Sequence, residues 1–211
     1  MPDLDKLHQA VIEGDWKTAA AATRAAVAAG AEPLDIVTGS LVPAMDEVGR
    51  LFECEEYFVP EMLLSARAMK ASMEIVRPLL AAAGAEPVGR VVIGTVKGDL
   101  HDIGKNLVAS MLEGGGFEVI DLGADVSPER FIEAVAARNA NLVALSALLT
   151  VTMGSMKTVI DAFRAAGLRD KVKIMVGGAP LTQQYADAIG ADGYGASAAA
   201  AVALARRLVA A

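Results

Sequence analysis

The second half of the chain alternates short apolar runs with amphipathic helical segments, and this alternation restricts the possible folds more than any other feature. The apolar runs cover residues 90–96, 117–122, 142–147, 172–176 and 192–194. Helical spacing of apolar residues follows them, over residues 103–112, 128–139, 153–166, 181–189 and 196–210. Strands joined through helices run parallel to one another. The sequence therefore predicts an α/β fold with a doubly wound, five-stranded parallel sheet in the order 2-1-3-4-5.

The part of the chain before this alternation shows helical periodicity only. A long helix is expected to begin at Pro60 and to run to Arg77, with Pro78 marking its end. Small residues, glycine and proline then follow over residues 81–89 without an apolar period, which is typical of a linker. The sequence predicts two domains, an N-terminal helical bundle over 1–85 and an α/β domain over 86–211.

Composition excludes several classes of function. With 54% hydrophobic residues among 211, the chain has enough apolar surface for a substantial core. The net charge is −7 and no cluster of basic residues interleaves with aromatics, so neither nucleic acid nor an anionic membrane is an expected partner. The N-terminal residues do not resemble a signal peptide, which predicts a cytoplasmic location. Cys54, the single cysteine, cannot form an internal disulfide and receives no role.

The loop after the first apolar run carries the residues most typical of a functional site. Asp99, His101 and Gly104 lie between this strand and the next helix, at the edge of a parallel sheet where ligands bind. A carboxylate two residues from a histidine can fix the imidazole tautomer and strengthen the ring as a metal ligand. The motif alone also fits an exposed histidine beside an aspartate that caps a helix, and both interpretations remain open here.

The predicted strand order places the end of the third strand beside this loop. Ser146 lies there and is expected to hydrogen-bond Asp99, completing a relay from His101 through a carboxylate to a hydroxyl. Glycines in the neighbouring loops would allow a bulky ligand to approach closely, although tight turns are the more common explanation for such glycines. They are Gly177, Gly178, Gly193 and Gly195.

These residues resemble the cobalamin-binding domains of methyl-transfer corrinoid proteins, a module similar to the one in methionine synthase. The quoted motifs are Asp99-x-His101-x-x-Gly104, Ser146-x-Leu148 and Gly177-Gly178, in that order. Upstream, residues 41–49 with Phe52, residues 57–61 and Ser65-Ala66-x-x-Met69 are similar to the helical cap of such proteins. The resemblance covers nearly the whole chain and implies a flavodoxin-like or Rossmann-like fold.

The resemblance also implies a cofactor and its ligands. Cobalamin or a related corrinoid would be bound base-off, with His101 as the lower axial ligand of cobalt and with Asp99 and Ser146 as the relay. The residues implied in cofactor binding are Gly98, Asp99, His101, Asp102, Ile103, Gly104, Ser146, Leu148, Thr150, Gly177, Gly178 and Gly195. In the helical part, Met45, Met62, Met69 and Met73 fit an ordinary core better than a shield for the upper face of the corrin.

By the same resemblance, the chain would carry a methyl group on cobalt between two enzymes and would not turn over alone. A substrate-specific methyltransferase would load the cobalt, a second would unload it to tetrahydrofolate or a thiol, and a reductive activator would restore it. The main alternative is the small cobalamin-binding subunit of a carbon-skeleton mutase, which the helical cap argues against. A signalling receiver domain is a further alternative, but Ser146 and Gly195 stand where its aspartate and lysine would be required.

Overall fold

The computed structural model describes residues 4–210 and separates them into two compact units. One unit contains the residues up to Pro87 together with Glu113–Gly116, and the other contains the remaining residues from Val88 onward. The helical elements of the first unit are α1 (Leu4–Ile12), α2 (Trp16–Ala28), α3 (Pro33–Ile36), the π-helix η1 (Val37–Leu41), α4 (Val42–Glu53) and α5 (Val59–Ala82).

Methionines fill part of the interior of the helical unit, as their helical spacing predicts. Met45, Met62 and Met69 are buried, and only Met73 retains intermediate exposure. An unbranched thioether side chain adapts to irregular gaps between helices, so these residues suit a core of short helices. The interpretation of these methionines as core residues is confirmed for the three buried ones.

The predicted end of the long helix at Pro78 is wrong, because α5 continues through this proline to Ala82. Pro78 lacks the N–H group that would bond to the carbonyl of residue 74. Both residues lie on the exposed side of the helix, where the freed carbonyl is accessible to solvent. Helical hydrogen bonding then resumes, and the Ala83 amide donates to the Leu79 carbonyl.

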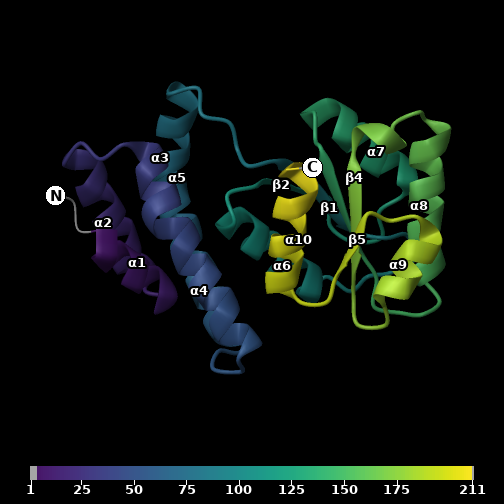
Figure 1. Ribbon diagram of the computed structural model, residues 1–211, viewed down its shortest axis with the longest axis horizontal. Helices are drawn as coiled ribbons and strands as arrows, with labels where there is room; N and C mark the ends of the chain where they lie inside the picture. The colour runs from purple at the N-terminus through teal and green to yellow at the C-terminus, as the bar shows by residue number, and fades with distance from the viewer. Residues whose placement is uncertain (1–3, 211) are drawn as a thin grey trace. The chain divides into compact units, whose positions relative to one another are not determined.

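The second unit is a parallel five-stranded sheet covered by helices on both faces. Its strands, which pair in the order β2-β1-β3-β4-β5, are β1 (Arg90–Thr95), β2 (Glu118–Asp121), β3 (Leu142–Ser146), β4 (Lys173–Gly177) and β5 (Gly193–Gly195). Its helices are α6 (Ile103–Gly114), α7 (Pro128–Arg138), α8 (Met153–Ala165), the short 3-10 helix η2 (Arg169–Lys171), α9 (Gln183–Ile189) and α10 (Ala198–Ala210). Helices α7, α8 and α9 lie on one face and α6 and α10 on the other (Figure 1). The predicted fold class and strand order are confirmed.

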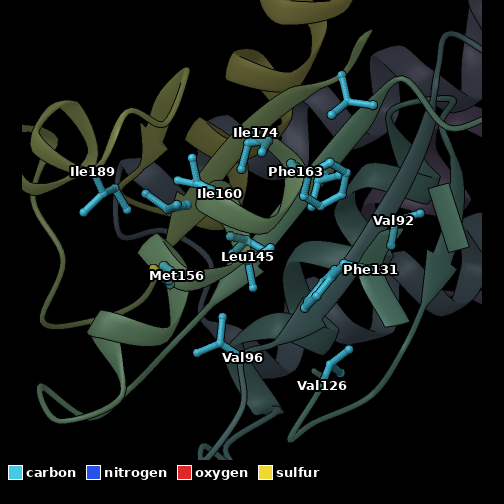
Figure 2. Packing of buried hydrophobic residues seen from close by; sticks show 14 of the residues in the cluster. Val92, Val96, Val126, Phe131, Leu145, Met156, Ile160, Phe163, Ile174 and Ile189 are labelled. Carbon is cyan, nitrogen blue, oxygen red and sulfur yellow. The ribbon is translucent and has the colours of Figure 1, made fainter. Parts of the chain in front are cut away.

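The core between the sheet and helices α7 to α9 holds the strands in register. Phe131 of α7 and Phe163 of α8 are fully buried and lie over β-branched and leucine side chains of the sheet (Figure 2). At Gly94 in β1, an added Cβ would lie 2.8 Å from the Phe131 ring, so the strand accepts no side chain there. The pairing that results places Thr95 opposite Ser146 and thereby brings the carboxyl ends of β1 and β3 together.

Candidate functional site

His101 lies in the loop between β1 and α6, and a buried carboxylate holds it in place. The His101 Nδ1 atom lies 2.7 Å from Asp99 Oδ1, and the His101 amide donates to the same oxygen at 3.0 Å. The Asp99 side chain is completely buried, whereas half of the His101 side chain is exposed. A carboxylate only accepts hydrogen bonds, so the imidazole proton resides on Nδ1 and Nε2 keeps its lone pair. This arrangement leaves Nε2 as the ring nitrogen able to bind a metal.

The second oxygen of Asp99 receives three hydrogen bonds from the loop after β3. Thr152 donates its hydroxyl to Oδ2 at 2.7 Å, and the amides of Leu148 and Leu149 donate at 2.8 and 3.2 Å. Burial raises the pKa of Asp99, but the bonds from Thr152, the His101 amide and Leu148 outweigh burial and hold the pKa well below its usual value. Asp99 is therefore an ionised carboxylate at neutral pH.

The hydroxyl partner predicted for Asp99 was wrong, because Thr152 occupies the position expected for Ser146. Ser146 is the last residue of β3, and its carbonyl accepts a bond from Val96 of the neighbouring segment. Thr152 follows a turn that begins at Leu149 and stands at the N-cap position of α8. A threonine directly before a predicted helix was the available signal, but its bond to Asp99 spans 53 residues and depends on the tertiary fold.

An apolar surface surrounds His101. The exposed apolar side chains of the two loops joined by Asp99 are Leu100, Ile103, Leu148, Leu149 and Val151. Ile103 is 80% exposed and Val151 is 85% exposed, which is unusual for such side chains. Exposed apolar surface gathered around a polar group is typical of a binding site for a large ligand. Ile103 and Leu148 were predicted here, whereas Leu100, Leu149 and Val151 were missed.

The predicted serine and two of the predicted glycines lie in one row across the carboxyl edge of the sheet. Thr95 pairs with Ser146, Ser146 with Gly177, and Gly177 with Gly195. Side-chain size decreases along this row, and the Thr95 hydroxyl donates to the His101 carbonyl at 2.8 Å. The row therefore connects the histidine loop to a part of the sheet edge with little side-chain volume.

The remaining predicted residues divide into two groups. Asp102 and Gly104 stand at the start of α6 beside His101, and a Cβ at Gly104 would meet open space. Thr150 is exposed in the loop after β3. Gly98 and Gly178 instead serve the backbone, since both have positive φ angles and a Cβ at Gly178 would collide with the Ala147 carbonyl. For Gly178, the tight-turn interpretation is confirmed.

Within residues 4–210, no three histidine, cysteine or acidic side chains are grouped to hold a metal ion. The site thus offers a single strong nitrogen donor on an apolar surface. In the same part of the chain, no helix is long and apolar enough to cross a membrane.

Comparison with known families identifies the family to which this chain belongs. A family model described as a B12 binding domain matches residues 89–203, and a second model with the same description matches residues 3–77. The chain belongs to the B12-binding corrinoid proteins. This membership disfavours the receiver-domain alternative, and it agrees with an α/β domain that places a histidine at the carboxyl edge of its sheet.

Several relatives of this corrinoid protein are known. Trimethylamine corrinoid protein 2 of Methanosarcina mazei is 44% identical over 200 residues, which cover 94% of this chain and 92% of the relative. A cobalamin-binding protein from Desulfitobacterium hafniense DCB-2 superposes with a TM-score of 0.82 at 31% identity, over 99% of both chains. A chain of the methanol:cobalamin methyltransferase complex MtaBC from Methanosarcina barkeri gives a TM-score of 0.87 at 31% identity, over 98% of this chain and 79% of that one. The chain is thus a corrinoid protein of methyltransferase systems.

The residues present fit a corrinoid. A corrinoid brings most of the ligands of its cobalt with it and needs few from the protein, and His101 Nε2 is a nitrogen donor that the loop leaves available. The flat and largely apolar ring suits the surface formed by Leu100, Ile103 and Val151. The side chains along the row from Ser146 to Gly195 are small. A Cβ at Gly177 would lie 3.3 Å from the Gly195 carbonyl oxygen and one at Gly195 would lie 3.0 Å from the Ala201 Cβ, so these two glycines also serve close packing within the domain.

Proposed function

We propose that this protein carries a methyl group on a corrinoid bound base-off, with His101 as the lower axial ligand. A substrate-specific methyltransferase would load the group, and a second methyltransferase would pass it to tetrahydrofolate or a thiol. The observation that carries the proposal is the bond between His101 Nδ1 and the buried Asp99, which leaves Nε2 free for cobalt. The bound corrinoid supplies a cobalt that accepts and releases methyl groups.

Asp99 would adjust the strength of His101 as a ligand. Its negative charge, 2.7 Å from the Nδ1 atom, increases the electron density available at Nε2. Thr152 and the two amides bonded to the other oxygen keep Asp99 ionised and fixed in orientation. The Asp99 carboxylate, bonded to Nδ1, would stabilise the ring if Nε2 carried a proton in place of the metal. Ligand release would therefore be coupled to proton uptake at Nε2.

We propose a division of roles among the residues around His101. Leu148, Ile103 and their apolar neighbours would support the corrin ring, and the row from Ser146 to Gly195 would line the slot for the displaced nucleotide tail. The full proposed set consists of Gly98, Asp99, His101, Asp102, Ile103, Gly104, Ser146, Leu148, Thr150, Gly177, Gly178 and Gly195, to which the structure adds Thr152. In this proposal, residues 1–85 are the cap domain and residues 86–211 the carrier domain.

Two findings support a methyltransferase partner. One relative is named a trimethylamine corrinoid protein, and one similar chain belongs to a methanol:cobalamin methyltransferase complex. The first name specifies a corrinoid protein, and the second specifies a methyltransferase complex that acts with cobalamin. The acceptor methyltransferase, a reductive activator and a cytoplasmic location complete the proposal.

Electron paramagnetic resonance tests the axial ligand. The protein is loaded with hydroxocobalamin, desalted and reduced to cobalt(II), beside the His101→Ala variant and a His8→Ala control. We expect splitting from one nitrogen, lost in His101→Ala, kept in His8→Ala and altered when the protein carries ¹⁵N-histidine. A protein that retains no corrinoid, or whose splitting ignores the histidine label, would contradict the proposed ligation.

A second experiment tests methyl transfer. The reduced, loaded protein is charged with labelled methyl iodide, and label is followed to tetrahydrofolate or a thiol after an acceptor methyltransferase is added. Transfer that depends on the acceptor enzyme supports the shuttle. Label that remains on the protein with both classes of acceptor enzyme argues against it.

A further inference from the structure

Asp125 lies outside the site described above, in the loop between β2 and α7, yet it contacts the histidine loop at two points. The Asp125 amide donates to the Asp99 carbonyl at 2.9 Å. In return, the Gly98 amide donates to Asp125 Oδ1 at 2.8 Å. These two bonds hold the main chain before Gly98 and after Asp99, so they enclose the residue that orients His101.

The backbone of Asp125 is adapted to this contact. Its φ angle is +55°, in the left-handed region that aspartate, asparagine and glycine tolerate better than other residues. In this conformation, its amide and its carboxylate both face the histidine loop. Gly98 also has a positive φ angle, +86°, so an unusual backbone conformation stands on each side of the contact.

The Asp99 amide also donates to the Val96 carbonyl at 3.1 Å, but no side chain takes part in that bond. The Ser155 hydroxyl donates to the Lys97 carbonyl, and the Thr95 hydroxyl donates to the His101 carbonyl, but neither bonds to a backbone group of Gly98 or Asp99. Lys97 pairs with Asp125 Oδ2 at 2.9 Å, but both side chains are substantially exposed, so this ion pair contributes little. The bond from the Gly98 amide is the principal contribution of the carboxylate.

We propose that Asp125 is a positioning residue for the cobalt ligand, acting on His101 through the backbone of Asp99. The proposal rests on the proposed role of His101 as the lower axial ligand. Half of the His101 ring is exposed, and its only side-chain bond runs to Asp99 Oδ1 among the described residues. The position of the Asp99 main chain, together with the donors that hold its carboxylate, therefore sets the position of the imidazole.

Two substitutions separate the carboxylate from the backbone conformation. Asp125→Gly retains the left-handed conformation but removes the acceptor for the Gly98 amide. Asp125→Asn retains the conformation and a side-chain oxygen for the Gly98 amide, and it replaces the charged oxygen that faces Lys97 with an amide nitrogen. Asn139→Gly is the matched control, because Asn139 also has a positive φ angle, +50°, but caps the far end of α7.

The variants are compared as cobalt(II) cobalamin complexes by electron paramagnetic resonance and by cobalamin binding. For Asp125→Gly, we expect loss of the histidine-nitrogen splitting from most of the bound cobalt and about a tenfold increase in the dissociation constant. Asp125→Asn and Asn139→Gly should retain the splitting of the parent. Asp125→Ser, whose shorter side chain does not reach the Gly98 amide, replaces the glycine variant if that variant does not fold.

The outcomes distinguish this proposal from the proposed function. If the parent shows histidine splitting that disappears in His101→Ala but persists unchanged in Asp125→Gly, the positioning role is wrong and the ligand assignment stands. An equal loss in Asn139→Gly also overturns the positioning role, since the effect is then not specific to this loop. A parent without histidine splitting refutes the ligand assignment itself.

Discussion

At the scale of single residues, Asp99 fixes the chemistry of the site because all of its hydrogen-bonding partners are donors. The His101 amide and ring face one oxygen, and Thr152 with two backbone amides faces the other. A buried carboxylate surrounded only by donors is stable as an anion. Asparagine, the neutral residue of the same shape, would place an NH2 donor where the neighbouring groups require an acceptor.

Asp99→Asn should therefore weaken axial ligation. The substituted side chain would have two possible orientations. With its NH2 group toward Thr152, that group would face three hydrogen-bond donors. With its NH2 group toward His101, the imidazole would have to accept a bond at Nδ1 and carry its proton on Nε2. That proton occupies the lone pair needed by cobalt. We expect a less negative cobalt(II)/cobalt(I) potential in a redox titration of the loaded variant, because a weaker axial donor favours the lower oxidation state. A potential equal to that of the parent would contradict the role given to Asp99.

Thr152→Val should destabilise the protein by about 1.5 to 3 kcal/mol, the usual contribution of a hydrogen bond to a charged group. The substitution preserves shape but leaves one bond to the buried carboxylate unmade. The measurement is the free energy of unfolding in urea without cofactor. Thr152→Ser, which retains the hydroxyl, should lose much less, and equal losses in the two variants would show that packing rather than the hydroxyl is responsible.

Thr152 also illustrates what local sequence patterns reveal and what they leave out. Asp99 and His101 are two residues apart, so their bond could be predicted from spacing alone. Which hydroxyl completes the network depends on the length and path of the loop between β3 and α8. Ser146 was the nearer candidate in sequence, but a strand residue whose main chain belongs to the sheet edge cannot replace one on the following turn.

At the scale of elements, local sequence patterns predicted the strands accurately, whereas the end of the long helix depends on the tertiary structure. Strands of the sheet interior are continuous apolar runs because helices cover both faces, and β1 and β3 were predicted to within a residue at each end. Helix α5 extends past Pro78 because that position is exposed, and exposure is a property of the tertiary structure. Local patterns therefore predicted elements well and their ends less well.

Glu118 connects three elements and should make stability depend on pH. From β2, it accepts a bond from Arg138 of α7 at 2.8 Å and one from Arg90 of β1 at 3.0 Å. The bond from Arg138 lowers the pKa of Glu118, burial opposes it, and the bond from Arg90 adds to the lowering. A pKa lower in the folded than in the unfolded state stabilises the fold above about pH 4.3, the unperturbed value. This contribution is lost as the pH falls through the lowered pKa.

Glu118→Gln should thus cost about 0.5 to 1 kcal/mol at pH 7, because the ion pairs are only partly buried. The difference from the parent should shrink as the pH falls below about 4. Urea unfolding at several pH values measures it, with Glu133→Gln as the control, since Glu133 pairs with Arg130 of its own helix. A difference between parent and Glu118→Gln that does not change with pH would contradict this account.

At the scale of the whole molecule, each unit has its own buried residues, and the proposed corrinoid site is built entirely by the α/β unit. The loops that meet at Asp99 both begin at the carboxyl edge of its sheet. Cofactor binding should therefore stabilise this unit before it affects any other part of the chain. A ligand that binds only the folded state stabilises it in proportion to the logarithm of its concentration.

Cobalamin at about one hundred times its dissociation constant should raise the unfolding free energy of the α/β unit by about 2.7 kcal/mol. Calorimetry with and without cobalamin measures the shift, and hydrogen exchange locates it. We expect increased protection at residues 98–104 and 146–152, which form the two loops, and much less in His101→Ala at the same cobalamin concentration. Hydrogen-exchange protection follows the contacts that binding creates. If cobalamin binds tightly but increases protection only in the helical unit, the proposed site in the α/β unit is wrong.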